Sequence, residues 1–107
     1  MTITEHLRAA RAFVERGWCQ NAFARQENGD PAVPRSKKAC QWCVMGALIA
    51  AMPGKPPAGL MVSCDALFRK AARTSLSIHK WQDKKGRKKE QVLRVFDKAI
   101  ILAETQS

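Results

Sequence analysis

A dense run of cationic side chains is the most distinctive chemical motif in the sequence. Only Asp83 and Glu90 oppose these charges nearby, and lysine and arginine at this density are typical of sites that bind anions. Arg87, Lys88 and Lys89 fall at the expected start of the last helix, where the helix dipole disfavours each cation by up to about 1 kcal/mol. A bound phosphate would reverse that cost, because free backbone N–H groups and cations would all face an anion. The run comprises Lys80, Lys84, Lys85, Arg87, Lys88 and Lys89.

Four further residues join this candidate anion-binding site. Arg69, Lys70 and Arg73 cluster at the C-terminal end of the preceding expected helix, where the dipole favours cations. Trp81 lies within the run and could stack on a nucleobase. The alternative interpretation is a solvated, charged turn with Trp81 in the core.

The four cysteines raise the question of a metal or redox site. Cys40 and Cys43 have the spacing of a zinc knuckle, and Cys19 and Cys64 could complete four ligands. Structural zinc sites usually pair two such knuckles, whereas here the outer cysteines are single and the inner pair falls in an expected helix. A redox motif would need a preceding strand, which the sequence does not predict. We therefore expect no metal and no cofactor.

Cys43 is also a candidate nucleophile. It falls in the first two turns of an expected helix, where the dipole favours a thiolate. His79 could act as its base, and Asp83, four residues further on, could orient the imidazole. Lys80 disfavours the imidazolium that would stabilise the thiolate, so a structural thiol and a protein without enzymatic activity are the favoured interpretation.

Periodic apolar residues predict the helices that would position these groups. Thr2 and Glu5 form an expected capping box, and Gly17 suits a left-handed position that ends the first helix. A second helix is expected to follow Ser36 as its N-cap. The expected helices span about 3–16, 37–52, 58–72 and 87–104, with a short turn of helix within 75–81 that buries Ile78 and Trp81.

The segment between the first two helices has no helical period. Residues 22–26 and 32–34 could form two short strands of a hairpin around Asn28-Gly29, although Pro31 and Pro34 weaken the second strand. An irregular loop is the alternative. The expected fold is mainly α: a compact bundle of four or five short helices, with or without this hairpin.

Length and composition set the broad class. The chain has 107 residues and is 46% hydrophobic, which predicts one globular domain over 1–107. No apolar run approaches the roughly 20 residues that span a bilayer, and no export signal is apparent, so we expect a cytoplasmic protein with reduced thiols and no membrane partner. The net charge is +10, of which residues 69–107 carry +7, with eleven basic and four acidic side chains.

Several short motifs form a recognisable pattern: Arg8-Ala9-Ala10-Arg11, Gly17-Trp18, Trp42-Cys43-Val44-Met45-Gly46-Ala47-Leu48, Trp81-Gln82-Asp83, Gly86-Arg87 and Phe96-Asp97-Lys98-Ala99-Ile100. This pattern resembles that of a family of small bacterial and phage proteins of unknown function. The resemblance implies a compact, mainly helical domain, sometimes carried by phages, and brings no established activity. Two positions depart from the family pattern: Gln82 replaces a usual Asn, and Lys88 replaces a Thr that would cap the last helix.

Charge, size and resemblance together predict a small non-enzymatic binding protein of phage or mobile-element type. Its ligand would carry phosphate, either as nucleic acid or as a nucleotide signal of host defence, so that the protein could counter that defence. One alternative is an inhibitor or adaptor that targets an acidic protein. The other is a cysteine-dependent enzyme using Cys43 and His79. Either a monomer or a homodimer is compatible with the sequence.

Overall fold

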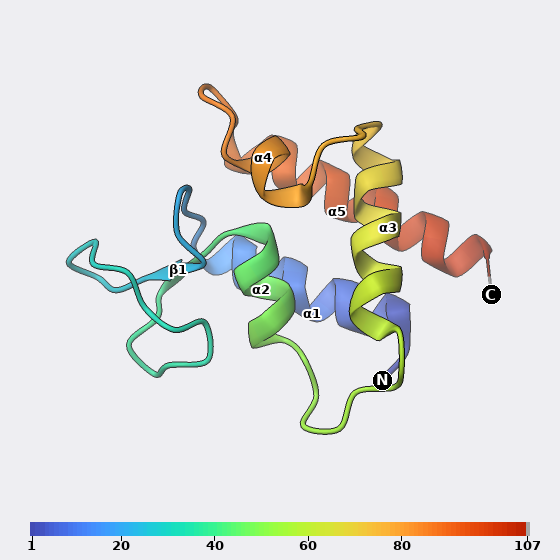
Figure 1. The fold of residues 1–107 in the computed structure, drawn as a ribbon, viewed down its shortest axis with the longest axis horizontal. Helices are drawn as coiled ribbons and strands as arrows, with labels where there is room; N and C mark the ends of the chain where they lie inside the picture. Colours follow the sequence, from blue (N-terminus) through green and yellow to red (C-terminus); the bar gives the residue numbers. More distant parts are fainter. Residues whose placement is uncertain (107) are drawn as a thin grey trace.

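The computed structural model describes residues 1–106, which form five helices and one pair of short antiparallel strands (Figure 1). This arrangement confirms the expected mainly helical class and the presence of a small hairpin between the first two helices. The elements are α1 (Ile3–Arg16), β1 (Ala24–Arg25), β2 (Gln41–Trp42), α2 (Val44–Ala50), α3 (Leu60–Ala72), α4 (Ile78–Gln82) and α5 (Lys89–Thr105).

The core lies where α3 crosses α1 and α5 (Figure 1). Phe68 of α3 is fully buried and packs edge-to-face against Trp81 of α4 and Phe96 of α5, with ring centroids 5.5 and 5.0 Å apart. Leu7 and Val14 of α1 are also fully buried. None of the helices within residues 1–106 is long and apolar enough to cross a membrane.

The first helix has the expected bounds, but the glycine that follows it has a different conformation from the expected one. Glu5 N donates to Thr2 Oγ1 at 3.1 Å and Thr2 N donates to Glu5 Oε1 at 3.0 Å, which confirms the capping box. The expectation of a left-handed Gly17 is wrong, because its φ of −173° is extended. Glycine is required there by proximity instead, since a Cβ would lie 2.2 Å from the carbonyl oxygen of Cys40.

The strand that pairs with β1 is not the expected one. Ala24 pairs with Trp42 and Arg25 with Gln41, so the partner comes from residues 41–42 rather than 32–34. Pro31 makes only an isolated bridge with Arg25, in keeping with the missing N–H of proline. The turn around Asn28-Gly29 does form and is closed by a 2.8 Å bond from Gln26 N to the carbonyl of Asp30.

The second helix starts seven residues later than expected. Residues 41–42 are extended because they pair with β1, so α2 begins at Val44 and Cys43 is its N-cap. The Cys43 thiol accepts a hydrogen bond from Gly46 N at 3.2 Å. Ser36, the expected cap, instead accepts a hydrogen bond from Lys38 N in a turn. Cys40 therefore lies outside the helix and is exposed.

The remaining helices deviate by two or three residues at their starts. α3 begins after Gly59, whose φ of +77° is left-handed. The expected short helix is present as α4, and its Ile78 and Trp81 are buried. α5 begins at Lys89, and Gln91 Oε1 accepts a hydrogen bond from Lys88 N at 2.9 Å, so a glutamine compensates in part for the missing polar cap.

Candidate functional site

The buried amide of Gln82 fixes the end of α4 and the lysine-rich loop that follows it. Its Oε1 accepts from Trp18 Nε1 at 2.5 Å and from Val44 N at 3.2 Å. Its Nε2 donates to the carbonyl of Cys19 at 3.1 Å and to Asp83 Oδ1 at 2.8 Å. Gln82 is fully buried, and both its amide oxygen and its amide nitrogen have hydrogen-bond partners. These bonds fix the positions of three separate segments relative to one another.

The loop between α4 and α5 is tied down at its base. Gln20 Nε2 donates to the carbonyls of Gln82 and Lys84, each at 3.0 Å, and Arg87 N donates to the carbonyl of Lys84 at 3.0 Å. Gly86 has a left-handed φ of +88° that permits this tight turn. The exposed side chains of Lys84 and Lys85 therefore project from a defined backbone.

Three of the expected anion-binding cations are engaged within the protein. Arg87 donates from Nε to the carbonyl of Trp81 at 3.0 Å, and its guanidinium lies 4.0 Å from the centroid of that ring. Lys89 Nζ donates to the carbonyl of Glu15 at 2.6 Å, near the C-terminal end of α1. Arg69 pairs with Asp65 at 3.1 Å.

Trp81 lies in the core, as the alternative interpretation held. Its side chain is only 8% exposed, with Phe68 on one side and the Arg87 guanidinium over the ring. This corrects the expectation that the ring is free to stack on a nucleobase.

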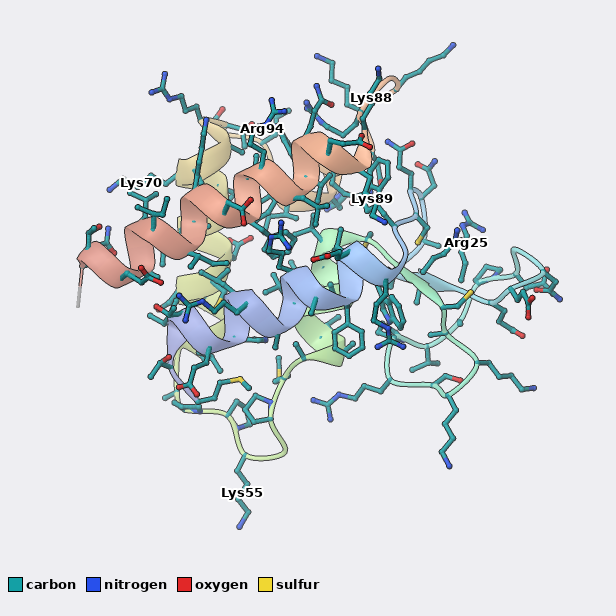
Figure 2. The ribbon with its side chains drawn as sticks, turned by 180° about the vertical axis from the view of Figure 1, so that it is seen from behind. Arg25, Lys55, Lys70, Lys88, Lys89 and Arg94 are labelled. Carbon is teal, nitrogen blue, oxygen red and sulfur yellow. The ribbon has the colours of Figure 1, made fainter. Side chains whose placement is uncertain are left out.

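The other cations of the C-terminal half form what we call the basic edge. All are exposed, and none has an ion-pair partner within the described residues. Figure 2 shows Lys70, Arg94 and Lys88 along one side of α5, whereas Lys89 lies on the other side, toward α1. The basic edge comprises Lys70, Arg73, Lys80, Lys84, Lys85, Lys88, Arg94 and Lys98.

One part of the basic edge is hollowed. Lys70, Arg73 and Lys98 surround a shallow depression of about 320 Å³ between α3 and α5. Its remaining lining is apolar and includes Ile101, which is 58% exposed. Lys98 and Arg94 were not among the predicted site residues, although their four-residue spacing on the polar side of the last helix could have indicated them.

Three of the four acidic residues in segment 69–107 are engaged elsewhere in the protein, and Glu90 is the one that lies among the basic residues. Asp97 and Glu104 of α5 pair with Arg11 and Arg8 of α1, the first at 2.7 Å. The Asp83 carboxylate accepts a hydrogen bond from Asn21 N. Arg8 and Arg11 of α1 are thereby paired with carboxylates, and most of the surplus positive charge of the C-terminal half lies on the basic edge.

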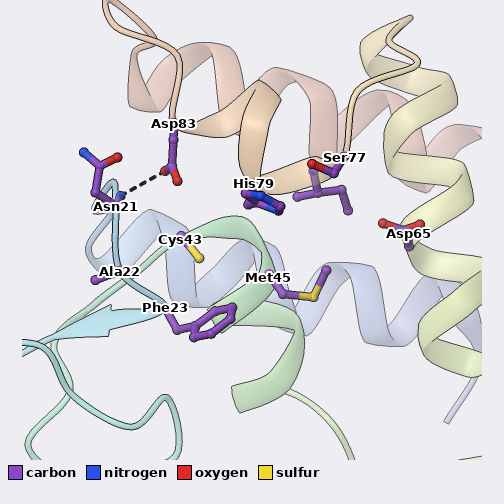
Figure 3. A pocket seen from close by; sticks show the side chains of 10 residues that line it. Asn21, Ala22, Phe23, Cys43, Met45, Asp65, Ser77, His79 and Asp83 are labelled. Atoms are coloured by element: carbon purple, nitrogen blue, oxygen red, sulfur yellow. Dashed lines mark hydrogen bonds between the residues drawn. The ribbon is translucent and has the colours of Figure 1, made fainter.

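A second feature is a pocket of about 540 Å³ bounded by α4, the start of α2, α3 and the segment around residue 22 (Figure 3). It brings Cys43, at the start of α2, together with His79 and Asp83, which lie on α4 and at its C-cap. Within residues 1–106 no hydrogen bond joins His79 to Cys43. Asp83 Oδ1 accepts from Asn21 N at 2.9 Å and from Gln82, and it does not orient the imidazole.

The Cys43 thiol is poorly suited to act as a nucleophile. Burial raises its pKa, and the N–H groups of Gly46 and Met45 lower it by less. The helix start therefore favours the thiolate as expected, but burial outweighs this effect and the net pKa of the thiol is raised. Burial also raises the pKa of Cys19 and of Cys64 to about 11.

Alkylation should distinguish the four thiols. At pH 8 a thiol with a pKa of about 11 is thiolate in roughly one molecule in a thousand, so burial and low thiolate content together protect it. We expect iodoacetamide to modify exposed Cys40 first and Cys19, Cys43 and Cys64 far more slowly, as counted by mass spectrometry. A Cys40→Ser variant should lose the fast phase. Rapid modification of Cys43 in that variant would revive the nucleophile interpretation.

The other histidine and the cysteines do not assemble into a metal site. Among the residues described, no group of three or more His, Cys, Asp or Glu side chains is placed to hold a metal ion. Buried His6 instead donates from Nε2 to the carbonyl of Leu48 at 2.8 Å, so its Nδ1 accepts from the Cys64 thiol at 3.5 Å. Both are structural partners that the sequence did not reveal.

These features define a small, mainly helical protein with a basic edge and one large pocket. The chain belongs to the family of unknown function DUF6197, whose model matches residues 1–102. This match confirms the resemblance to an uncharacterised family. No curated protein and no solved structure matches the chain significantly.

Proposed function

We propose that the protein is a non-enzymatic binding protein whose basic edge holds a phosphate-bearing ligand, either nucleic acid or a nucleotide. The observation that carries this proposal is the separation of charge. Arg8 and Arg11 are matched by carboxylates, whereas the eight cations of the basic edge have no such partners within residues 1–106.

Electrostatics favour an anionic ligand at this edge. Unpaired like charges repel one another, and phosphates that neutralise them release that repulsion together with counterions. The depression around Lys70, Arg73 and Lys98 adds an apolar floor, which suits a ligand that combines phosphate with a base or sugar. A nucleotide signal of host defence would fit this description, and a role in countering defence is part of the proposal.

Salt-dependent DNA binding tests the proposal. We expect labelled single- or double-stranded DNA to bind at low salt, with an affinity that falls steeply as salt rises, measured by fluorescence anisotropy. Replacing Lys84, Lys85 and Lys88 with Gln should reduce the slope of log K against log salt by about 0.9 for each lost contact with duplex DNA. Their exposed side chains make no hydrogen bond within the described residues, so the fold should be preserved.

A matched control separates a local site from net charge. Lys37, Lys38 and Lys55 are exposed in loops, and Figure 2 shows Lys55 well away from the basic edge. Their replacement with Gln changes the net charge equally and should leave the affinity near that of the parent. Equal losses in the two triple variants would contradict a site at the basic edge. Failure of DNA to bind at low salt would exclude nucleic acid and direct the search to nucleotides and to acidic proteins.

A further inference from the structure

We propose that the pocket of Figure 3 is a second binding site, for a small amine carried on an aromatic or other apolar body. It would hold the ammonium group of the ligand at Asp83. This site shares no lining residue with the basic edge, and its ligand is a cation, whereas the ligand proposed for the basic edge is an anion. The two proposals can therefore be tested independently.

The size and lining of the pocket suit one small molecule. Its volume of about 540 Å³ falls within the range of about 300–1,000 Å³ that is usual for ligand pockets. Phe23, Met45 and Ile78 supply apolar lining, and the Phe23 side chain is 55% exposed. An aromatic ligand would cover this ring and contact the Met45 thioether, both favourable interactions.

The polar groups select the charge of the ligand. Asp83 Oδ1 is engaged by Asn21 N and Gln82 Nε2, whereas its Oδ2 accepts no hydrogen bond from the residues described. Asp65, at the other end of the pocket in Figure 3, is already paired with Arg69. The Cys43 thiol adds no charge at neutral pH because burial raises its pKa. The unpaired negative charge therefore lies at the Asp83 end.

The Asp83 carboxylate is also held in place before a ligand arrives. Its two intramolecular hydrogen bonds, at 2.9 and 2.8 Å, fix the side chain, so little conformational entropy is lost when Oδ2 accepts an ammonium. The net charge of +10 repels cations at a distance. Because the Debye length at 0.15 M salt is about 8 Å, contacts within the pocket determine the affinity for the ligand. The hydroxyl of Ser77 and the ring of His79 offer additional polar contacts.

Three ligands that share an indole ring test the charge preference directly. Tryptamine, tryptophol and indole-3-acetate carry a cation, a neutral hydroxyl and an anion, respectively. In a protein-observed NMR titration at 0.15 M salt, we expect tryptamine to bind tightest and indole-3-acetate weakest, with shifts concentrated at the amides of the lining residues. Binding that is equal for the three, or tightest for the anion, would overturn the proposal.

Variants localise the site. Asp83→Asn keeps an oxygen acceptor for Asn21 N and should weaken tryptamine about fivefold to tenfold while changing tryptophol little, because only the charged contact is lost. Phe23→Ala removes an exposed ring and should weaken both ligands. Glu27→Gln makes the same charge change as Asp83→Asn at an exposed residue outside the pocket, and should leave both affinities unchanged. An unchanged tryptamine affinity in Asp83→Asn and Phe23→Ala would place the ligand elsewhere and refute the proposal.

Discussion

Replacing Gly46 with alanine should destabilise the protein by about 3 kcal/mol. A Cβ at this position would lie 1.8 Å from the carbonyl oxygen of Phe23 and 2.7 Å from its carbonyl carbon. That backbone cannot move away freely, because the same carbonyl accepts a 3.1 Å hydrogen bond from Cys43 N and precedes β1. Helix propensity alone would favour alanine by about 1 kcal/mol. A net destabilisation would therefore show that the close approach of the Phe23 carbonyl outweighs helix propensity.

Urea unfolding followed by circular dichroism measures this loss, with Gly54→Ala as the matched control. Gly54 is exposed and has no heavy atom within 4 Å of a built Cβ, so its replacement should change the free energy of unfolding by less than about 0.5 kcal/mol. A Gly46→Ala variant as stable as the parent would mean that α2 and the Phe23 backbone do not approach as described. The apolar side of the pocket, which includes Phe23 and Met45, depends on that approach.

The helices could be predicted from the sequence because their signals are local. The capping box at Thr2 and Glu5 and the three- and four-residue spacing of apolar residues lie within one or two turns, so α1 was predicted with its bounds. The start of α2 was misplaced because residues 41–42 have their pairing partner at residues 24–25, and helical periodicity carries no information about such a partner. Long-range pairing overrode the local pattern at this point.

Glycines show the same limit more sharply. The sequence suggested a left-handed helix end at Gly17, but the residue is extended and is needed because the carbonyl of Cys40 approaches it. Glycine is likewise required at position 46 because the backbone of Phe23, twenty-three residues away in the sequence, lies too close for a Cβ. The local sequence shows that a glycine is present, but whether it serves a turn or a close approach of two backbones depends on residues far away in the sequence.

The candidate sites were predictable to different degrees. The cationic run is a compositional signal and was found directly, but its division into free and engaged cations depended on tertiary neighbours such as the carbonyl of Glu15 for Lys89. The pocket draws residues from four separate segments. The sequence singled out Cys43, His79 and Asp83 as chemically interesting, but it could not show that Asp83 would be held by Asn21 rather than face the imidazole.

Replacing Gln82 with leucine should cost about 3 to 5 kcal/mol and loosen the lysine-rich loop. The change leaves Trp18 Nε1, Val44 N and the carbonyl of Cys19 without the partner that the amide now provides. Each buried polar group without a partner costs about 1 to 3 kcal/mol, partly recovered where water can reach it. Because the amide joins the end of α4 to residues 18–19 and to the start of α2, its loss should also loosen the loop that follows α4.

Hydrogen exchange at the amides of residues 84–88 separates this local effect from global unfolding. In Gln82→Leu these amides should exchange faster than the change in global stability alone explains, because the end of α4, from which the loop starts, loses its side-chain contacts with residues 18–19 and 44. Gln106→Leu is the matched control, since Gln106 is exposed and its side chain makes no hydrogen bond within the described residues; its stability should change by less than about 0.5 kcal/mol. If Gln82→Leu were as stable as Gln106→Leu, the amide network would not be what fixes α4 and the following loop. The basic edge would then be mobile at Lys84 and Lys85, and binding there would require that loop to become ordered.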